Sequence, residues 1–215
     1  MIGIFQFDTP SFREIISKFN PKNFQDLILI TSLNRPGANK NINDIYKKRN
    51  SSLEYKNLQF DSQELNSILD LTYGDIIFEE QVTQILSFCL SLNISESELL
   101  RKKMKEFFKE ENELENFKSY FLKHSSKNLR ENDKNLILNK LIQSIPYMFN
   151  KAHATSYSYL SYYTAYLKAN YFLESSIFFL NKNIGDKRKT YSLIEEILEE
   201  NFEVSKPEIN SSEIE

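Results

Sequence analysis

The stretch FNKAHATSYSYLSYYTAYLKANY, from Phe149 to Tyr171, predicts one long helix. Asn150 is a good N-cap, because its side-chain oxygen can accept an N–H group of the first turn. Neither Gly nor Pro interrupts the pattern from Lys151 to Ala169. A helix that is apolar or aromatic nearly all round is mostly buried, so we expect burial here. One stripe is small (Ala154, Ser158, Ser161 and Ala165), which would let a backbone approach, and tyrosines cover most of the rest (Tyr157, Tyr159, Tyr162, Tyr163 and Tyr166).

The start of this helix is a candidate anion site. Free N–H groups and the helix dipole favour negative charge at a helix N-terminus. Lys151 and His153 lie in the first turn beside the Asn150 cap, and together these residues indicate a phosphate site. A structural alternative is also open, and these residues alone favour it. In that alternative Asn150 only caps the helix, Lys151 is solvated, and His153 is a hydrogen-bonded structural histidine.

Composition indicates a globular chain and excludes several kinds of site. Of the 215 residues, 40% are hydrophobic and 27% charged, enough to bury the core of one domain or two small ones. The single cysteine, Cys89, cannot form an internal disulfide, which fits a reducing cytosol, and it lies in an apolar run that predicts a buried, inert thiol. With only two histidines, a Cys/His metal cluster is excluded. We recognise no signal peptide and no apolar stretch approaching about 20 residues, so we expect a cytoplasmic protein without a membrane partner.

The charge is unevenly distributed along the chain. The formal net charge is −3, but residues 194–215 hold eight Glu and one Lys, so the remainder is mildly basic. A basic body with an acidic tail permits a nucleic-acid surface without demanding one. The run Lys47-Lys48-Arg49 adds a weak basic patch.

Apolar periodicity predicts a mainly α fold, with extended segments confined to about 1–8 and 51–60. Ser95 and Glu98 have the spacing of a capping box for a helix that carries Arg101 and Lys102. Glu80, in the motif that leads into a preceding helix, is interpreted as a residue that holds the fold together through a buried hydrogen bond.

Several motifs resemble the fingers region of the bacterial replicative polymerase, the DNA polymerase III alpha subunit (C-family). That family typically reads Phe-Asn-Lys-Ser-His-Ala-Ala-Ala-Tyr where this chain has residues 149–157. The resemblance covers essentially the whole chain. The other matching motifs are Gly-Ile-Phe-Gln-Phe at 3–7, Arg-Pro-Gly at 35–37, Thr-Tyr-Gly at 72–74, Glu-Gln-Val at 80–82 and Leu-Leu-Arg-Lys at 99–102.

The resemblance implies a multi-helix fingers domain with a short extended N-terminal segment. Its expected division is a fingers-like domain at 1–190, then a terminal helix and acidic tail at 191–215 that begin the segment after the fingers. Its implied function is to bind incoming dNTP and primer-template DNA in DNA replication. The residues assigned to phosphate or primer-end contacts are Arg35, Arg101, Lys102, Lys151 and His153, with Asn150 and Tyr157 shaping the site.

The resemblance does not supply a complete polymerase site. In the family, three palm aspartates hold the metal ions, and they lie upstream of the matched part; no Asp-x-Asp occurs here. We therefore assign no catalytic or metal-binding residue, expect no activity from this chain alone, and expect Mg²⁺ only with a palm-containing partner chain. The chain resembles an isolated fingers region from a truncated or split gene or a decayed paralogue. Two alternatives stay open: a non-catalytic helical adaptor that binds a polymerase or DNA, and an inactive remnant.

Overall fold

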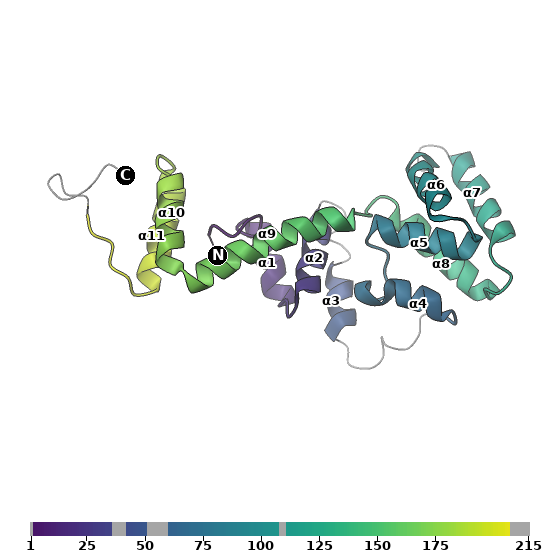
Figure 1. Ribbon diagram of the computed structural model, residues 1–215, viewed down its shortest axis with the longest axis horizontal. Helices are drawn as coiled ribbons and strands as arrows, with labels where there is room; N and C mark the ends of the chain where they lie inside the picture. Colours follow the sequence, from purple (N-terminus) through teal and green to yellow (C-terminus); the bar gives the residue numbers. More distant parts are fainter. Residues whose placement is uncertain (1, 36–41, 51–59, 108–110, 207–215) are drawn as a thin grey trace. The chain divides into compact units, whose positions relative to one another are not determined.

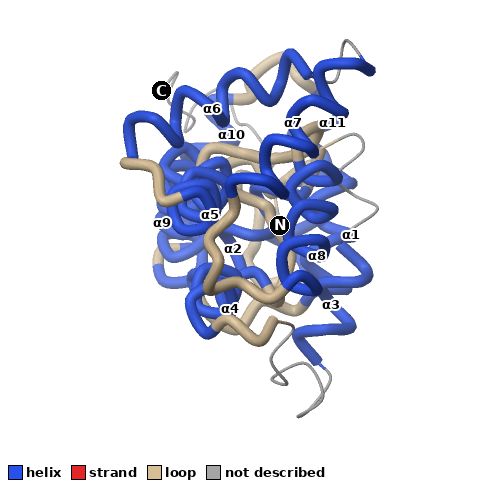
Figure 2. The backbone as a smooth tube through the Cα atoms, turned by 90° about the vertical axis from the view of Figure 1, so that its right-hand side faces the viewer, coloured by secondary structure: helices blue, strands red, loops and turns tan. Residues whose placement is uncertain are grey.

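The computed structural model describes residues 2–35, 42–50, 60–107 and 111–206. Within these ranges the chain is helical and no strand is present (Figures 1 and 2), which confirms the predicted mainly α fold class. The helices are α1 (Pro10–Phe19), α2 (Phe24–Leu33), α3 (Ile42–Asn50), α4 (Gln63–Leu69), the 3-10 helix η3 (Asp70–Thr72), α5 (Glu79–Leu90), α6 (Ile94–Phe107), α7 (Glu111–His124), α8 (Glu131–Ser144), α9 (Lys151–Asn170), α10 (Phe172–Lys182) and α11 (Lys187–Glu199).

The prediction of an extended segment at the N-terminus is wrong. Residues 2–8 form turns, with Gly3 and Gln6 at φ values of 81° and 59°. Positive φ reverses the chain and is incompatible with a continuous strand. A side chain at position 3 would also collide with the ring of Phe179, so glycine permits both the turn and the close approach. The second expected extended segment, 51–60, lies outside the described residues except for Phe60.

Contacts divide the chain into two units. One comprises residues 1–17 and 158–215, and the other comprises residues 18–157. Helix α9 contributes its first turns to the second unit and the remainder to the first. The division at 190 that the resemblance implies stays a prediction.

The core of the 18–157 unit is built from one face of each of the helices α4 to α8. Cys89 is fully buried in it, as predicted, and burial raises the pKa of its thiol to about 12, so the thiol is protonated and unreactive at neutral pH. Each fully buried large apolar side chain contributes about 1.5–3 kcal/mol. Members of this core that expose no surface include Leu65, Val82, Ile85, Leu86, Met104, Phe121, Ile137 and Leu141.

A buried glutamine fixes the segment that leads into α5. The Gln81 amide oxygen accepts from the backbone N–H groups of Ile77 and Phe78, both at 3.0 Å. Its amide nitrogen donates to the Ile68 carbonyl at 3.0 Å and to Thr72 Oγ1 at 2.7 Å. One side chain thus satisfies buried polar groups at the end of α4, in η3 and at the start of α5, which leaves this turn little freedom.

The segment before α5 pairs with the segment before α9. Phe78 and Phe149 form an isolated parallel bridge. The Phe149 N–H donates to the Ile77 carbonyl at 2.8 Å, and the Glu79 N–H donates to the Phe149 carbonyl at 2.9 Å. The two helices therefore begin side by side, which brings the glutamates of α5 to the first turn of α9.

A buried ion pair ties α3 to α2. Arg49 Nη2 lies 2.7 Å from Asp26 Oδ2, and the two side chains are 8% and 1% exposed. The Arg49 guanidinium also lies 4.7 Å from the centre of the Phe19 ring. Asp26 Oδ2 accepts a further hydrogen bond from the Lys22 N–H. Breaking a buried pair leaves an uncompensated charge, so this contact is a sensitive point of the fold.

Replacing Arg49 by Met should lower the free energy of unfolding by about 3–5 kcal/mol, because Asp26 would remain buried without its cation. Urea denaturation measures the change. The matched control is Lys118→Met, which removes a more exposed pair with Glu115 and should cost less than about 1 kcal/mol. Equal costs for the two variants would show that the buried pair contributes no more than a surface pair.

Candidate functional site

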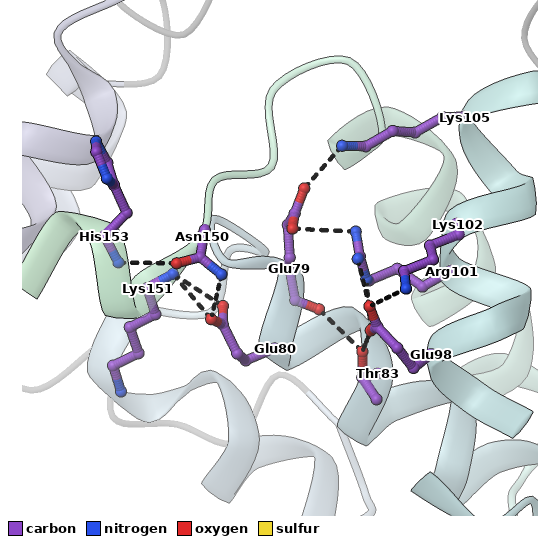
Figure 3. A network of polar contacts seen from close by, with 10 residues as sticks. All are labelled: Glu79, Glu80, Thr83, Glu98, Arg101, Lys102, Lys105, Asn150, Lys151 and His153. Atoms are coloured by element: carbon purple, nitrogen blue, oxygen red, sulfur yellow. Dashed lines mark hydrogen bonds and ion pairs between the residues drawn. The ribbon is translucent and has the colours of Figure 1, made fainter. Parts of the chain in front are cut away.

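The first turn of α9 is capped by two side chains. Asn150 is the N-cap, as predicted, because its Oδ1 accepts the His153 N–H at 2.8 Å. Both carboxylate oxygens of Glu80 accept the Lys151 N–H, at 3.0 and 2.9 Å, and Oε1 also accepts from Asn150 Nδ2 at 3.1 Å (Figure 3). A carboxylate of the chain itself therefore occupies N–H groups of the predicted anion site. Glu80 ties α5 to α9 as interpreted, although it is half-buried rather than buried.

Aromatic rings surround the exposed imidazole of His153. Its ring centre lies 5.4 Å from that of Phe149 in an edge-on arrangement and 4.1 Å from that of Tyr157. The Arg35 guanidinium lies 4.2 Å from the centre of the Phe149 ring. The structure thus brings Arg35, His153 and Tyr157 together around Phe149, beside Asn150.

Arg35 also anchors its loop. Its Nη2 donates to the Tyr147 carbonyl at 2.6 Å and its Nε donates to the Ser32 carbonyl at 3.1 Å. Partial burial lowers the pKa of the guanidinium, and the charge of Glu79 opposes this shift. These carbonyl contacts make Arg35 a structural link between the end of α2 and the segment before α9.

Lys151 faces a cleft beside α4 and α5. Its Nζ lies 5.6 Å from the centre of the Phe78 ring. Lys151, Glu80 and Phe78 form part of the lining of this cleft, whose volume is about 680 Å³. The cleft therefore has a cation and a carboxylate at the start of α9, with a polar and apolar lining that includes Gln84 and Leu71.

The two predicted basic residues of α6 have different surroundings. The Arg101 side chain is 8% exposed and its guanidinium grips Glu98 with Nε at 2.8 Å and Nη2 at 2.6 Å, while Nη1 lies 3.1 Å from Glu79 (Figure 3). Lys102 is 65% exposed, and its Nζ lies 3.8 Å from Glu98. Lys105, also exposed, pairs with Glu79 at 2.7 Å. Two carboxylates thus neutralise Arg101, whereas the Lys102 ammonium faces solvent.

The partners of Arg101 were not identified from the sequence. Glu98 has a signal, because opposite charges three residues apart face each other on a helix. Its pKa falls to about 2, chiefly through the hydrogen bond from Arg101, with a further contribution from the Thr83 hydroxyl at 3.0 Å. Glu79 has no such signal, since only the packing of α5 against α6 brings it to Arg101.

The predicted capping box of α6 is wrong. The helix begins at Ile94, and its cap is Asn93. Asn93 Oδ1 accepts the Glu96 N–H and Glu96 Oε2 accepts the Asn93 N–H, both at 2.9 Å. Asparagine caps as well as serine, and the spacing of three is the same, so the pair two residues upstream forms the reciprocal cap. Glu98 is thereby left to bind Arg101.

The predicted burial of α9 is wrong for its tyrosines. Ala154, Ser158 and Ser161 of the small stripe are buried. The aromatic face, in contrast, is about half exposed, since tyrosine can keep its hydroxyl and ring edge in water. The exposed fractions are 48% for Tyr159, 48% for Tyr162, 57% for Tyr163 and 50% for Tyr166.

A backbone does approach the small stripe of α9, as the sequence predicts. Ser161 Oγ donates to the Phe5 carbonyl, and the Phe5 N–H donates to Thr164 Oγ1, both at 2.9 Å. The N-terminal turns therefore pack on this helix through main-chain hydrogen bonds.

Two kinds of feature are absent from the described ranges. No group of three His, Cys, Asp or Glu side chains in these ranges is placed to hold a metal ion. None of the helices in these ranges combines the length and apolar character that crossing a membrane requires.

Comparison with known proteins identifies the family. The sequence pattern of the bacterial DNA polymerase III alpha subunit finger domain matches residues 1–129. The chain belongs to the DNA polymerase III alpha subunit family. It is 32% identical over 213 residues to DNA polymerase III subunit alpha of Staphylococcus aureus (strain Mu50), a match that covers 98% of this chain and 19% of that protein. It is 30% identical over 211 residues to the same subunit of Ureaplasma parvum, covering 96% of this chain and 21% of that protein.

The predicted resemblance to the DNA polymerase III alpha fingers is thus confirmed. The chain spans about one fifth of the length of these relatives. Helix α9 lies beyond residue 129, outside the part that matches the finger-domain pattern. Its similarity to the family therefore rests on the relatives, whose match covers 213 residues of this chain.

Replacing Glu80 by Ala should lower the stability of this polymerase fingers chain by about 0.5–2 kcal/mol, because the Lys151 N–H and the Asn150 amide lose their acceptor. Glu80→Gln should cost less, since its amide oxygen still accepts. Urea denaturation gives the free energies, and hydrogen exchange at the Lys151 amide reports the cap directly. The control is Glu195→Ala, an exposed change within α11. Equal exchange at Lys151 in wild type and Glu80→Ala would contradict the cap.

The contribution of Glu98 to stability should depend on pH. Its pKa in the folded chain is about 2, below the ordinary value of 4.5, so the carboxylate stabilises the fold fully above pH 4.5. This stabilisation declines as the pH falls from 4.5 toward 2. We expect the stability difference between wild type and Glu98→Gln, measured by denaturation at several pH values, to shrink across that window. A difference that stays constant across it would contradict the ion pair with Arg101.

Proposed function

We propose that this chain acts as the fingers region of a DNA polymerase III alpha subunit, as a fragment or truncated paralogue, and binds incoming dNTP and primer-template DNA in DNA replication. The observation that carries the proposal is the cluster at the start of α9. Asn150, Lys151, His153 and Tyr157 lie at the start of α9, and two residues distant in sequence reach it: Arg35, on the Phe149 ring, and Glu80, at the helix cap.

Each residue has a proposed role that follows from its surroundings. Lys151 and His153 contact phosphate or the primer end, because both lie in the first turn of α9 and His153 is exposed. Arg35, Asn150 and Tyr157 shape the site, and the guanidinium adds positive charge.

The basic residues of α6 contribute through charge. The exposed ammonium of Lys102 suits a phosphate contact that carries no sequence information. For Arg101 the proposal requires a phosphate to compete with Glu79 and Glu98 for the guanidinium. A phosphate can compete with these carboxylates only when it lies close to α6, as a phosphate of a bound nucleotide or DNA strand would.

A palm-containing polymerase chain is the proposed protein partner. The exposed tyrosines of α9 and the exposed Ile177 and Phe178 of α10 support an interface, because aromatic and apolar residues of this kind are enriched where proteins meet. Nucleotide transfer and its Mg²⁺ would come with that partner, so this chain alone is proposed to be inactive. A cytoplasmic location goes with this role, because the template DNA lies there.

A non-catalytic adaptor that binds a polymerase or DNA is the second candidate. The ion pairs of Glu79 and Glu98 with the basic side chains of α6 favour it, because they reduce the charge that would hold a triphosphate. An adaptor would bind the polymerase or DNA and show no affinity for dNTP. An inactive remnant would bind none of them.

DNA binding by the purified chain should be weak and independent of sequence, with dissociation constants on the order of 10⁻⁴–10⁻⁶ M that rise steeply with salt. Lys102→Ala and Lys151→Ala should each weaken it and reduce the salt slope by about one. Fluorescence anisotropy with a labelled primer-template measures both quantities, and calorimetry with dATP distinguishes the fingers from the adaptor. The control is Lys123→Ala, an exposed lysine on α7.

Removing the acidic tail should tighten DNA binding, because the tail competes for the basic surface. Deleting the whole acidic segment 194–215 would cut α11, whose Ile197 is buried, so the deletion is limited to residues 207–215, which carry three of the eight Glu. If neither the whole chain nor this shortened form binds DNA at low salt, the nucleic-acid function fails.

A further inference from the structure

A polar cavity of about 300 Å³ lies beside Asp75, away from the start of α9. Its lining comes from α3, from the segment before α5 and from the second half of α8. Three lysines contribute to it: Lys47 and Lys48 from α3 and Lys140 from α8. The cavity belongs wholly to the 18–157 unit.

Two of these lysines share one carboxylate. Lys48 Nζ lies 2.5 Å from Asp75 Oδ2, and Lys140 Nζ lies 3.3 Å from Asp75 Oδ1. The exposed fractions of the three side chains are 17% for Lys48, 15% for Lys140 and 25% for Asp75. Both ammonium groups therefore pair with the Asp75 carboxylate, and all three side chains are partly covered.

Two further charged residues line the cavity. Lys47 adds a third positive charge at the cavity, and Asp44 adds a second negative one. The described residues of the lining thus carry three positive and two negative charges. The Gln143 amide also lines the cavity and can donate to a ligand.

The surroundings of Lys140 lower the pKa of its ammonium group. Burial lowers its pKa most, the charge of Lys48 lowers it further, and Asp75 opposes both effects. An anion in the cavity would compensate the burial and the repulsion between the two ammonium groups. Lysine is well suited to phosphate, because its ammonium is a compact point charge with three donors.

We propose that this cavity is a phosphate-binding site in which Lys48 and Lys140 hold the phosphate group, Lys47 adds charge at the rim and Gln143 donates a hydrogen bond. The site is separate from the residues proposed above for the start of α9. The phosphate comes from a free nucleotide or from a nucleic-acid backbone, which present the same chemistry to the lysines. Asp75 holds both ammonium groups in place in the empty site and competes with the ligand.

Competition between Asp75 and the phosphate gives a test whose expected result, tighter binding, cannot arise from loss of folding. Pyrophosphate is titrated into the whole chain by calorimetry. Asp75→Asn removes the competing charge and should tighten binding by about tenfold, whereas Lys140→Gln should weaken it by about tenfold or more. Lys134→Gln is the matched control, because Lys134 lies on the same helix, is 10% exposed and pairs with Glu131 outside the cavity. It should bind pyrophosphate as wild type does.

The opposite results overturn the proposal. A purely structural role for the Lys48–Asp75–Lys140 cluster predicts that Asp75→Asn destabilises the chain without any gain in pyrophosphate affinity. Absence of pyrophosphate binding in both wild type and Asp75→Asn would also overturn the proposal. If Lys140→Gln does not fold, the Asp75→Asn result alone decides.

Two further arms identify the source of the phosphate. The same variants are titrated with dATP and with a single-stranded oligonucleotide that lacks terminal phosphate. Loss of affinity in Lys140→Gln for dATP alone assigns the site to free nucleotides, and loss for the oligonucleotide alone assigns it to a backbone. The tighter pyrophosphate binding of Asp75→Asn should persist when Lys151→Ala is added to it, so a failure at the start of α9 is distinguishable from a failure here.

Discussion

The pairing of Phe78 with Phe149 is the contact on which the candidate site depends. It fixes the starts of α5 and α9 side by side, and buried Gln81 holds the Phe78 side of the pair in place. Only because of this pairing can Glu80 reach the first turn of α9. Phe149 also presents its ring to Arg35 and His153, so a main-chain contact between two loops determines where the polar side chains gather.

The electrostatics of the same region are set by carboxylates rather than by the basic residues alone. Glu80 satisfies the N-terminus of α9, and Glu79 and Glu98 hold Arg101. An anionic ligand would therefore exchange one set of contacts for another instead of filling a vacant positive site. Exchange of this kind lowers affinity but keeps the free chain stable, since the buried cations of the described part, Arg49, Arg101 and Lys134, already have carboxylate partners.

Local signals in the sequence predicted the helical class, the extent of α9, its Asn150 cap, the close approach at its small stripe and the buried Cys89. Each depends on neighbouring residues or on composition. Features that depend on distant segments were not predictable: the close approach at Gly3 involves the ring of Phe179, and the neutralisation of Arg101 involves Glu79 from another helix. The tyrosines of α9 were misjudged because periodicity shows that a face is aromatic but not whether another element covers it.

The contacts of Lys168 bear on the order in which the chain folds during synthesis. Its ammonium donates to the Ile2 carbonyl at 2.5 Å and pairs with Glu196 at 2.6 Å, so one side chain joins the N-terminal turns to α9 and α11. Residues 1–17 and 158–215 form one unit from opposite ends of the sequence, whereas residues 18–157 form a continuous one. During synthesis the continuous unit can fold as soon as it emerges, but the N-terminal turns must wait for about 150 further residues before their partners exist. The order of synthesis therefore separates residues 2–17 from their partners until the segment after residue 157 has been made.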